Sequence, residues 1–169
     1  WLGYVSGNHE QWTLRVAGYD SNREIVPKHI LYDTDEIGFT LAVGDNEWKC
    51  IARHKWPGSS MYNPLHPQTR GSKFSRPGYD VYVGAHTHPG ALAADHPRGD
   101  GDVISLLQCG TYKDSDAFAR RIGFPETGRT TAVVSIFFPN GYHFSVANVD
   151  IAAHIMRDIY KVKEPARTG

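Results

Sequence analysis

Short apolar runs rich in β-branched and aromatic residues recur along the chain and end at glycine, proline or polar residues. Runs of this length with such boundaries are typical of buried strands. The pattern predicts strands over residues 1–5, 39–43, 48–53, 80–83, 103–108, 130–138 and 142–146. The intervening Gly44-Asp45-Asn46 and Pro139-Asn140-Gly141 are turn sequences, so we expect each to close a hairpin between its flanking strands.

Helical patterns are fewer. Residues 10–17 are expected to form one to two helical turns in which Trp12, Leu14 and Val16 are partly buried, and residues 114–122 are weakly helical. The clearest amphipathic pattern comes last, with Ile151, Ile155 and Ile159 at intervals of four, joined by Ala152, Met156 and Tyr160. Asp150 is the expected N-cap of that helix.

Two long segments, residues 56–78 and 90–102, are rich in glycine and proline and are predicted to be loops. Loops of such length in a compact domain are usually functional or disordered. The basic residues Arg70, Lys73 and Arg76 of the first loop either clamp a phosphate group or are ordinary solvated charges. Residues 25–33 give a mixed signal that Pro27 interrupts.

A succession of strands and hairpins with few helices suits an α+β or mixed α/β layered domain. The 169 residues are enough for one hydrophobic core and too few for two, so residues 1–169 are interpreted as a single domain. Because the first apolar run is already under way at residue 1, we expect the chain to be a piece of something longer.

Composition narrows the function classes. Lys plus Arg and Asp plus Glu number 18 each, so the formal net charge is zero and a general attraction to nucleic acid or anionic membranes is not supported. No run of about 18 apolar residues is present, which predicts no membrane span.

Cys50 and Cys109 lie in apolar runs without C-x-x-C spacing. We expect free thiols in a reducing, cytoplasmic compartment, with a disulfide between them as the alternative.

Polar side chains that bind metals follow three of the predicted strands. Residues 6–10 read S-G-N-H-E after the first strand, His54 ends the strand over 48–53, and residues 84–88 read G-A-H-T-H after the strand over 80–83. Open α/β sheets place their sites at such strand ends. If the backbone over 86–88 stays extended, His86 and His88 leave on the same side, where neutral imidazoles are common ligands of transition metals.

The order G-N-H-E, a lone histidine after a strand, and H-x-H after another strand resembles the second half of the calcineurin-like metallophosphoesterases. That family carries five blocks: D-x-H, G-D-x-x-D, G-N-H-D/E, a lone H, and G-H-x-H. Only the last three are present in this chain, and Ala85 stands where the family has a glycine directly before the first histidine of H-x-H. The matching blocks lie sparsely over residues 7–88, and the part after residue 110 supports the resemblance only loosely.

The resemblance implies a four-layer α/β/β/α sandwich of two mixed sheets flanked by helices, of which this chain would be the C-terminal portion. It implies that the amide oxygen of Asn8, with His54 and His86, binds the second of two metal ions, and that His88 binds the first. It assigns His9 as the proton donor or charge stabiliser beside the leaving group. His66, in Y-N-P-L-H-P, competes with His54 for the lone-histidine role, and we favour His54 because it directly ends a strand.

The activity implied is hydrolysis of phosphoester bonds, in a monoester or a diester, by two divalent ions that activate a bridging water and clamp the displacement at phosphorus. Imidazole and oxygen ligands suit Mn, Fe, Zn or Ni alike. The substrate would be a phosphorylated protein, a nucleotide or a nucleic acid, and no substrate-binding residue is identified.

The ligands that the family takes from D-x-H and G-D-x-x-D are missing. We therefore expect this chain to bind at most one ion, weakly, and to hydrolyse little unless a missing N-terminal segment or another chain supplies them. The alternative is a non-catalytic structural or assembly module that retains half a metal site. His29, His96, His143 and His154 are interpreted as structural or solvated residues.

Overall fold

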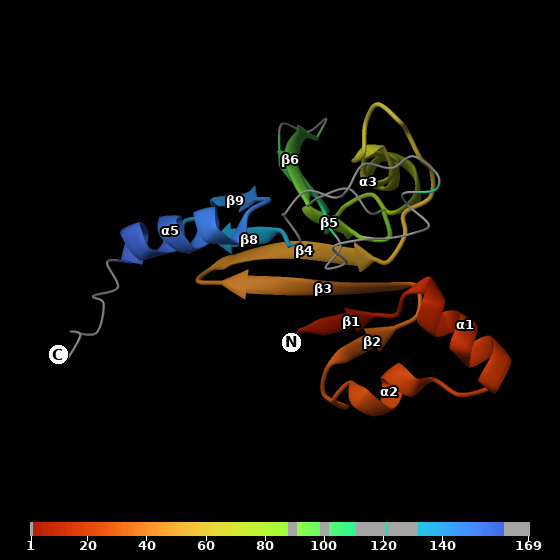
Figure 1. The fold of residues 1–169 in the computed structure, drawn as a ribbon. Coiled ribbons are helices and arrows are strands. Elements are labelled where there is room, and N and C mark those ends of the chain that lie inside the picture. The colour runs from red at the N-terminus through yellow and green to blue at the C-terminus, as the bar shows by residue number, and fades with distance from the viewer. Residues whose placement is uncertain (1, 88–90, 99–101, 111–120, 122–131, 161–169) are drawn as a thin grey trace.

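A computed structural model describes residues 2–87, 91–98, 102–110, 121 and 132–160 (Figure 1). In chain order its elements are β1 (Gly3–Val5), α1 (Asn8–Ala17), α2 (Ser21–Ile25), β2 (Leu31–Asp33), β3 (Glu36–Val43), β4 (Asn46–Arg53), α3 (His66–Arg70), a π-helical turn (Gly71–Ser75), β5 (Val81–Gly84), β6 (Leu92–Pro97), β7 (Val103–Gln108), β8 (Val134–Phe137), β9 (His143–Val146) and α5 (Val149–Tyr160). The fold class is mixed α/β, as predicted. The expected helix over 114–122 lies outside the described ranges, apart from residue 121.

The largest element is a five-stranded mixed sheet with the strand order β3-β4-β5-β7-β6. β4, β5 and β7 run parallel to one another, and the antiparallel strands β3 and β6 form the two edges. β1 and β2 form a separate parallel pair, and β8 and β9 form an antiparallel hairpin. Because β4 and β5 are parallel neighbours, the segments that leave their carboxyl ends emerge side by side.

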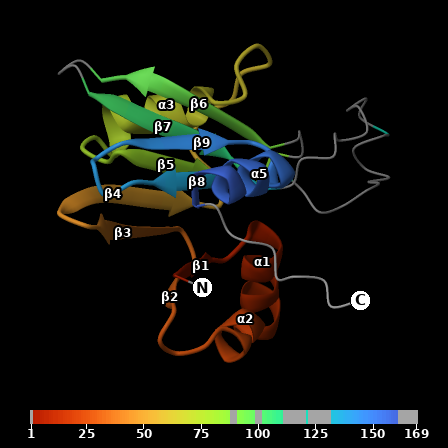
Figure 2. The same cartoon turned by 90° about the vertical axis from the view of Figure 1, so that its left-hand side faces the viewer.

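Alternation along the central strands divides their side chains between two buried clusters. Ile51 and Tyr82 belong to one cluster, whereas their chain neighbours Cys50 and Val81 belong to the other. This is the two-residue period of a strand whose two faces are both covered. α3 contacts β5 and β7 and covers the first face, while the β8–β9 hairpin packs on the second, where Phe137 lies against Trp48 with ring centroids 5.1 Å apart. Figure 2 shows the hairpin and α5 in front of the sheet.

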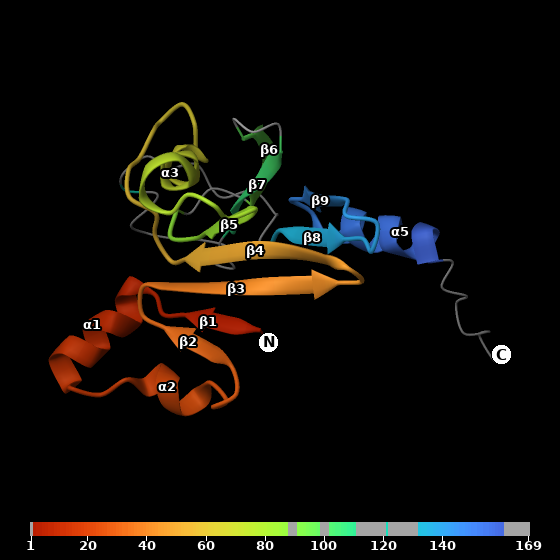
Figure 3. The same cartoon turned by 180° about the vertical axis from the view of Figure 1, so that it is seen from behind.

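The N-terminal part, from β1 to β2, lies beneath β3 on the side away from α3, as Figures 1 and 3 show. α1 begins at Asn8, two residues earlier than predicted, and ends at Gly18, whose left-handed backbone (φ 67°) lets its N–H donate to the Leu14 carbonyl at 2.8 Å. Leu14 is partly buried, as expected, but Trp12 and Val16, also expected to be partly buried, are each 66% exposed.

Both long loops predicted from glycine and proline are wrong in part. Residues 56–78 contain α3 and the π-helical turn, in which Pro67 occupies the start of α3, where its missing N–H costs nothing. Residues 90–102 contain β6, whose Pro97 is tolerated because β6 is an edge strand. Glycine and proline correctly predicted interruptions in these segments. Between the interruptions, β6 forms because it pairs with β7, and α3 forms where it packs against β5 and β7.

The last helix, α5, is confirmed, but its predicted cap is wrong. The helix begins at Val149, and the side chain of Asn148 accepts a hydrogen bond from the Ile151 N–H at 3.0 Å. Asn148 is therefore the N-cap, and Asp150 lies in the first turn. Within the described part of the chain, no helix is long and apolar enough to cross a membrane.

Candidate metal centre

Three of the predicted ligands come from three different elements. Asn8 is the first residue of α1, directly after the short link from β1. His54 follows the last residue of β4, and His86 lies two residues beyond β5. Since β4 and β5 are adjacent and parallel, their carboxyl ends bring the two histidines to one edge of the sheet, as the strand-end argument predicted.

The three polar atoms meet. His54 Nε2 lies 2.9 Å from Asn8 Oδ1 and 3.0 Å from His86 Nδ1, and His86 Nδ1 lies 3.2 Å from Asn8 Oδ1. The amide oxygen carries no proton, and each imidazole nitrogen carries at most one when neutral. At most two protons are therefore available for the three contacts, so at least one contact has no hydrogen bond. The lone pairs of the amide oxygen and the imidazole nitrogens thus lie close together.

The spacing of these atoms fits a transition-metal ion. Bonds from such ions to nitrogen and oxygen ligands are about 2.0–2.2 Å long, so ligands at the right angles of an octahedral site lie about 3 Å apart, and those of a tetrahedral zinc site about 3.4 Å. The observed separations of 2.9, 3.0 and 3.2 Å match one triangular face of such a site. Among the residues that the structure describes, no group of three or more His, Cys, Asp or Glu side chains could hold a metal, and this trio contains only two. Its role as a ligand set stays a prediction.

Gly7 of the G-N-H-E block allows α1 to approach His54 closely. A Cβ atom at Gly7 would lie 2.5 Å from Glu10 Oε2 and 3.2 Å from His54 Cε1. The glycine therefore leaves room for the imidazole beside the first turn of α1. The Gln11 side chain of α1 donates a hydrogen bond to the carbonyl of Thr34, which lies between β2 and β3, and so connects the helix to that segment. The sequence motif thus has a packing reason as well as a chemical one.

The turn that carries His86 is not extended, so the condition under which His86 and His88 would leave on the same side is not met at His86. His86 has φ 71°, and among the described residues it is the only one other than glycine with positive φ. The Thr87 N–H donates to the Ala85 carbonyl at 2.9 Å and closes a three-residue turn around His86. His88 itself lies outside the described ranges.

Burial lowers the pKa of His54, and the neighbouring His9 and Lys55 lower it further, whereas the carboxylate of Glu10 acts in the opposite direction. His54 is therefore neutral at physiological pH, the form in which the ring offers a lone pair to a metal. His9, the second residue of α1, is exposed and lies close enough to influence His54, but forms no part of the three-atom cluster.

His66, the competitor of His54, is the first residue of α3, and its ring packs beside Gly58. It is His54 that lies next to Asn8 and His86. Of the three basic residues proposed for a phosphate clamp, Arg76 is paired with Glu36 at 2.6 Å, and Arg70 and Lys73 are exposed. That arrangement favours ordinary charges over a clamp.

Sequence analysis missed the polar residues behind the cluster. Gln68 of α3 and Gln108, the last residue of β7, are 0% and 2% exposed and are hydrogen-bonded to each other. The available signal was an amide side chain at the end of the apolar run S-L-L-Q. A polar residue at the end of a strand that lies between two buried faces needs partners inside the protein.

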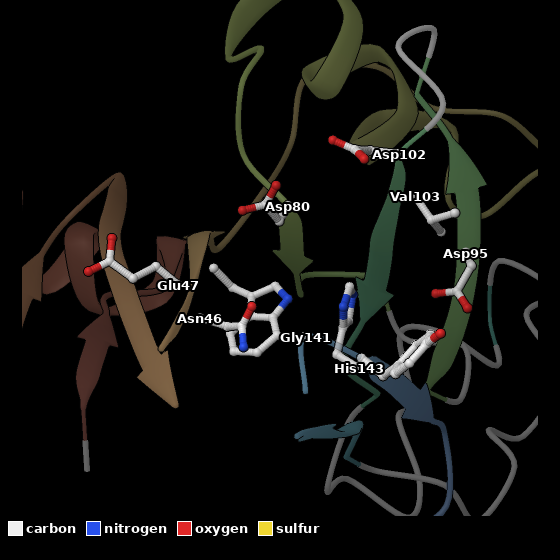
Figure 4. A pocket seen from close by; sticks show the side chains of 10 residues that line it. Asn46, Glu47, Asp80, Asp95, Asp102, Val103, Gly141 and His143 are labelled. Atoms are coloured by element: carbon white, nitrogen blue, oxygen red, sulfur yellow. The ribbon is translucent and has the colours of Figure 1, made fainter. Parts of the chain in front are cut away.

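A separate cavity of about 600 Å³ lies at the opposite ends of the same strands, next to Asn46 at the start of β4 and Asp80 just before β5. Figure 4 shows its lining, which includes the carboxylates of Glu47, Asp80, Asp95 and Asp102 together with His143. His143, predicted to be structural, lies 3.0 Å from the Ser105 hydroxyl, which also donates to Asp95 at 2.9 Å. The cavity is thus distinct from the cluster of Asn8, His54 and His86.

Both cysteines are free thiols in the structure, Cys50 buried and Cys109 half-buried. Burial raises the pKa of both thiols, and the Asp80 carboxylate adds to the effect at Cys50, whose pKa rises to about 11. Comparison of the chain with protein-family models, with curated proteins and with solved structures finds no match.

Proposed function

We propose that the chain carries part of the centre of a metal-dependent phosphoesterase, in which Asn8, His54 and His86 hold one divalent ion. The observation that supports this is the convergence of one amide oxygen and two imidazole nitrogens to within 2.9–3.2 Å of one another. These are the three residues that the resemblance assigns to one ion. Oxygen and imidazole ligands suit Mn, Fe, Zn or Ni.

A bound divalent ion in such a centre lowers the pKa of a water ligand and stabilises the charge that develops on phosphoryl oxygens. The residues of this chain would hold the ion in place: Asn8 lies in the first turn of α1, and His54 and His86 follow the ends of β4 and β5. His9, exposed at the next position of α1, is proposed to donate a proton to the leaving-group oxygen.

The trio is a partial ligand set for such a centre, because it contains no carboxylate and offers three protein ligands, where closed structural sites take four and open catalytic sites complete three with water. We therefore propose that a preceding segment or another chain supplies carboxylates, and that the five-stranded sheet belongs to a four-layer α/β/β/α sandwich completed by it. In that assembly His88 would bind a second ion. Alone, the chain is expected to bind one ion weakly and to hydrolyse little.

The substrate is proposed to be a phosphomonoester or phosphodiester, including nucleotides or nucleic acid as substrates. The test is hydrolysis of p-nitrophenyl phosphate and of bis(p-nitrophenyl) phosphate by the complete protein with added Mn²⁺. Asn8→Ala should abolish the Mn²⁺-dependent rate, whereas His66→Ala, a matched histidine outside the cluster, should leave it unchanged.

A complete protein that binds Mn²⁺ at this cluster but hydrolyses neither ester would support the alternative, a structural or assembly module that keeps half a metal site. Equal rates in wild type and Asn8→Ala would contradict the proposal. The ratio of the two rates would tell whether the centre prefers one or two ester bonds on phosphorus.

A further inference from the structure

Behind the His86 turn lies a pair of buried amides. Gln68 Nε2 donates to Gln108 Oε1 at 2.6 Å and to the Leu107 carbonyl at 3.3 Å. Gln108 Nε2 in turn donates to the Ala85 carbonyl at 2.8 Å and to the Cys109 carbonyl at 3.1 Å. The pair therefore links α3 and β7 to the peptide group directly before His86.

The polar character of this pair has a cost that packing alone does not explain. Gln68 is 0% and Gln108 2% exposed, and the Oε1 atom of Gln68 has no hydrogen-bond partner among the described residues. Leaving a buried amide atom unpaired costs about 1–3 kcal/mol, and an apolar side chain of similar volume would avoid it. The hydrogen bonds to the turn are what an apolar replacement could not supply.

Those bonds act where the backbone is strained. His86 has φ 71°, a region that costs a residue with a Cβ on the order of 1–3 kcal/mol. The Ala85 carbonyl accepts from Gln108 on one side and from the Thr87 N–H, at 2.9 Å, on the other. The Ala85 N–H donates to the His54 carbonyl at 3.3 Å. Both backbone polar atoms of Ala85 are thus hydrogen-bonded, and its carbonyl belongs to the peptide group directly before His86.

Gly84 and Trp56 pack closely against the Gln68–Gln108 pair. A Cβ at Gly84 would overlap Gln68 Nε2 and would lie 2.9 Å from Trp56 Cδ1 and 3.2 Å from Gln108 Oε1. Trp56 also donates its indole N–H to the Val83 carbonyl at 2.8 Å. Gly84 therefore lets the amide pair reach the strand end.

We infer that Gln108, held by Gln68, is a positioning residue for His86: it fixes the Ala85 peptide so that the His86 imidazole faces His54 and Asn8. This inference deepens the proposed function and rests on it for its consequence in metal binding. Its geometric part concerns the protein alone and is tested without metal.

The test variant is Gln108→Met, which keeps the volume and removes both donors. Its matched control is Ser105→Ala, which removes an equally buried hydroxyl from the same strand but at the end next to His143, away from the turn. The rings of His54 and His86 lie edge to face with centroids 5.0 Å apart, so their ring protons should give a nuclear Overhauser effect in the metal-free protein.

We expect the effect between the His54 and His86 rings to be present in wild type and Ser105→Ala and lost in folded Gln108→Met. Its persistence at full strength in Gln108→Met would overturn the inference. If Gln108→Met does not fold, Gln68→Met takes its place: it removes the donor that holds Gln108, so the effect should weaken, and an unchanged effect would again overturn the inference.

The second readout is Co²⁺ affinity, measured by the visible absorption of the bound ion. Residues behind metal ligands typically contribute about 10- to 100-fold in affinity, so Gln108→Met should bind Co²⁺ at least about tenfold more weakly than Ser105→Ala. If wild type binds no Co²⁺, the proposed function fails, while the ring-proton measurement still decides the positioning role on its own.

Discussion

Replacing Gly84 by alanine tests the packing around the His86 turn. The added Cβ would overlap Gln68 Nε2 and approach Trp56 Cδ1 to 2.9 Å. Neither neighbour has room to move, because Gln68 is 0% and Trp56 3% exposed. Overpacking of this kind costs about 1–3 kcal/mol. If Gln68 is displaced from Gln108, a buried amide loses its partner at a further cost of about 1–3 kcal/mol.

We therefore expect Gly84→Ala to lower the free energy of unfolding by about 2–6 kcal/mol, measured by urea denaturation followed by tryptophan fluorescence. The control is Gly38→Ala on the edge strand β3, where the nearest contact of the new Cβ would be the Tyr79 hydroxyl at 3.0 Å, with the carbons of the same ring at 3.5 Å or more. That contact is with the tip of a side chain, so the control should change the free energy of unfolding by less than about 1 kcal/mol.

The contact with Gln68 can be isolated in a double-mutant cycle. In a Gln68→Ala background the amide that the new Cβ would overlap is absent, so Gly84→Ala should cost less there than in wild type, by at least about 1 kcal/mol. Additive effects, or a Gly84→Ala variant as stable as Gly38→Ala, would refute the packing argument.

In a protein with the complete centre, His9→Ala should leave metal content unchanged and lower kcat by about 10²- to 10⁴-fold, with a smaller loss for substrates whose leaving group needs no proton; equal turnover on good and poor leaving groups would remove its catalytic role. Because burial raises the pKa of Cys50 from 9.0 to about 11, the unfolded thiol ionises first, so the free energy of unfolding should fall as pH rises from about 9 to 11, and this part of the pH dependence should vanish in Cys50→Ala. Asn148→Ala should lower the free energy of unfolding, measured by thermal denaturation, by about 1 kcal/mol, because α5 loses its N-cap. Asp150→Ala should lower it by less, and a larger effect of Asp150→Ala would indicate that Asp150 is the cap.

The parts of the fold that were predicted correctly are those in which local pattern and long-range packing agree. The apolar runs became β4, β5 and β7, and both hairpin turns formed as expected, because a strand buried on two faces needs continuous apolar residues. β6 was missed because Leu92–Pro97 carries a charge, a histidine and a proline, and only pairing with β7 makes it a strand. Of the three apolar residues of α1 expected to be partly buried, Leu14 is, whereas Trp12 and Val16 are exposed, because a short apolar pattern does not tell which of its residues will meet a neighbouring element.

The meeting of His54 and His86 follows from the parallel pairing of β4 and β5, since residues at the ends of adjacent parallel strands lie close together. Asn8 follows β1, which belongs to a separate pair with β2, so the strand order of the main sheet does not place it there. The backbone at His86 could not be predicted, because its positive φ depends on hydrogen bonds from Gln108 and Thr87, one of which comes from another strand. Buried amide pairs leave almost no trace in the periodicity of a sequence.

The most direct test of the metal centre is calorimetric titration of Mn²⁺ into the wild-type chain, His54→Ala and His66→Ala. His54 lies 2.9 Å from Asn8 Oδ1 and 3.0 Å from His86 Nδ1, while His66 packs beside Gly58. We predict one weak site in wild type, the same site in His66→Ala, and none in His54→Ala. Binding that survives in His54→Ala but disappears in His66→Ala, or two tight sites in the wild-type chain, would contradict the account.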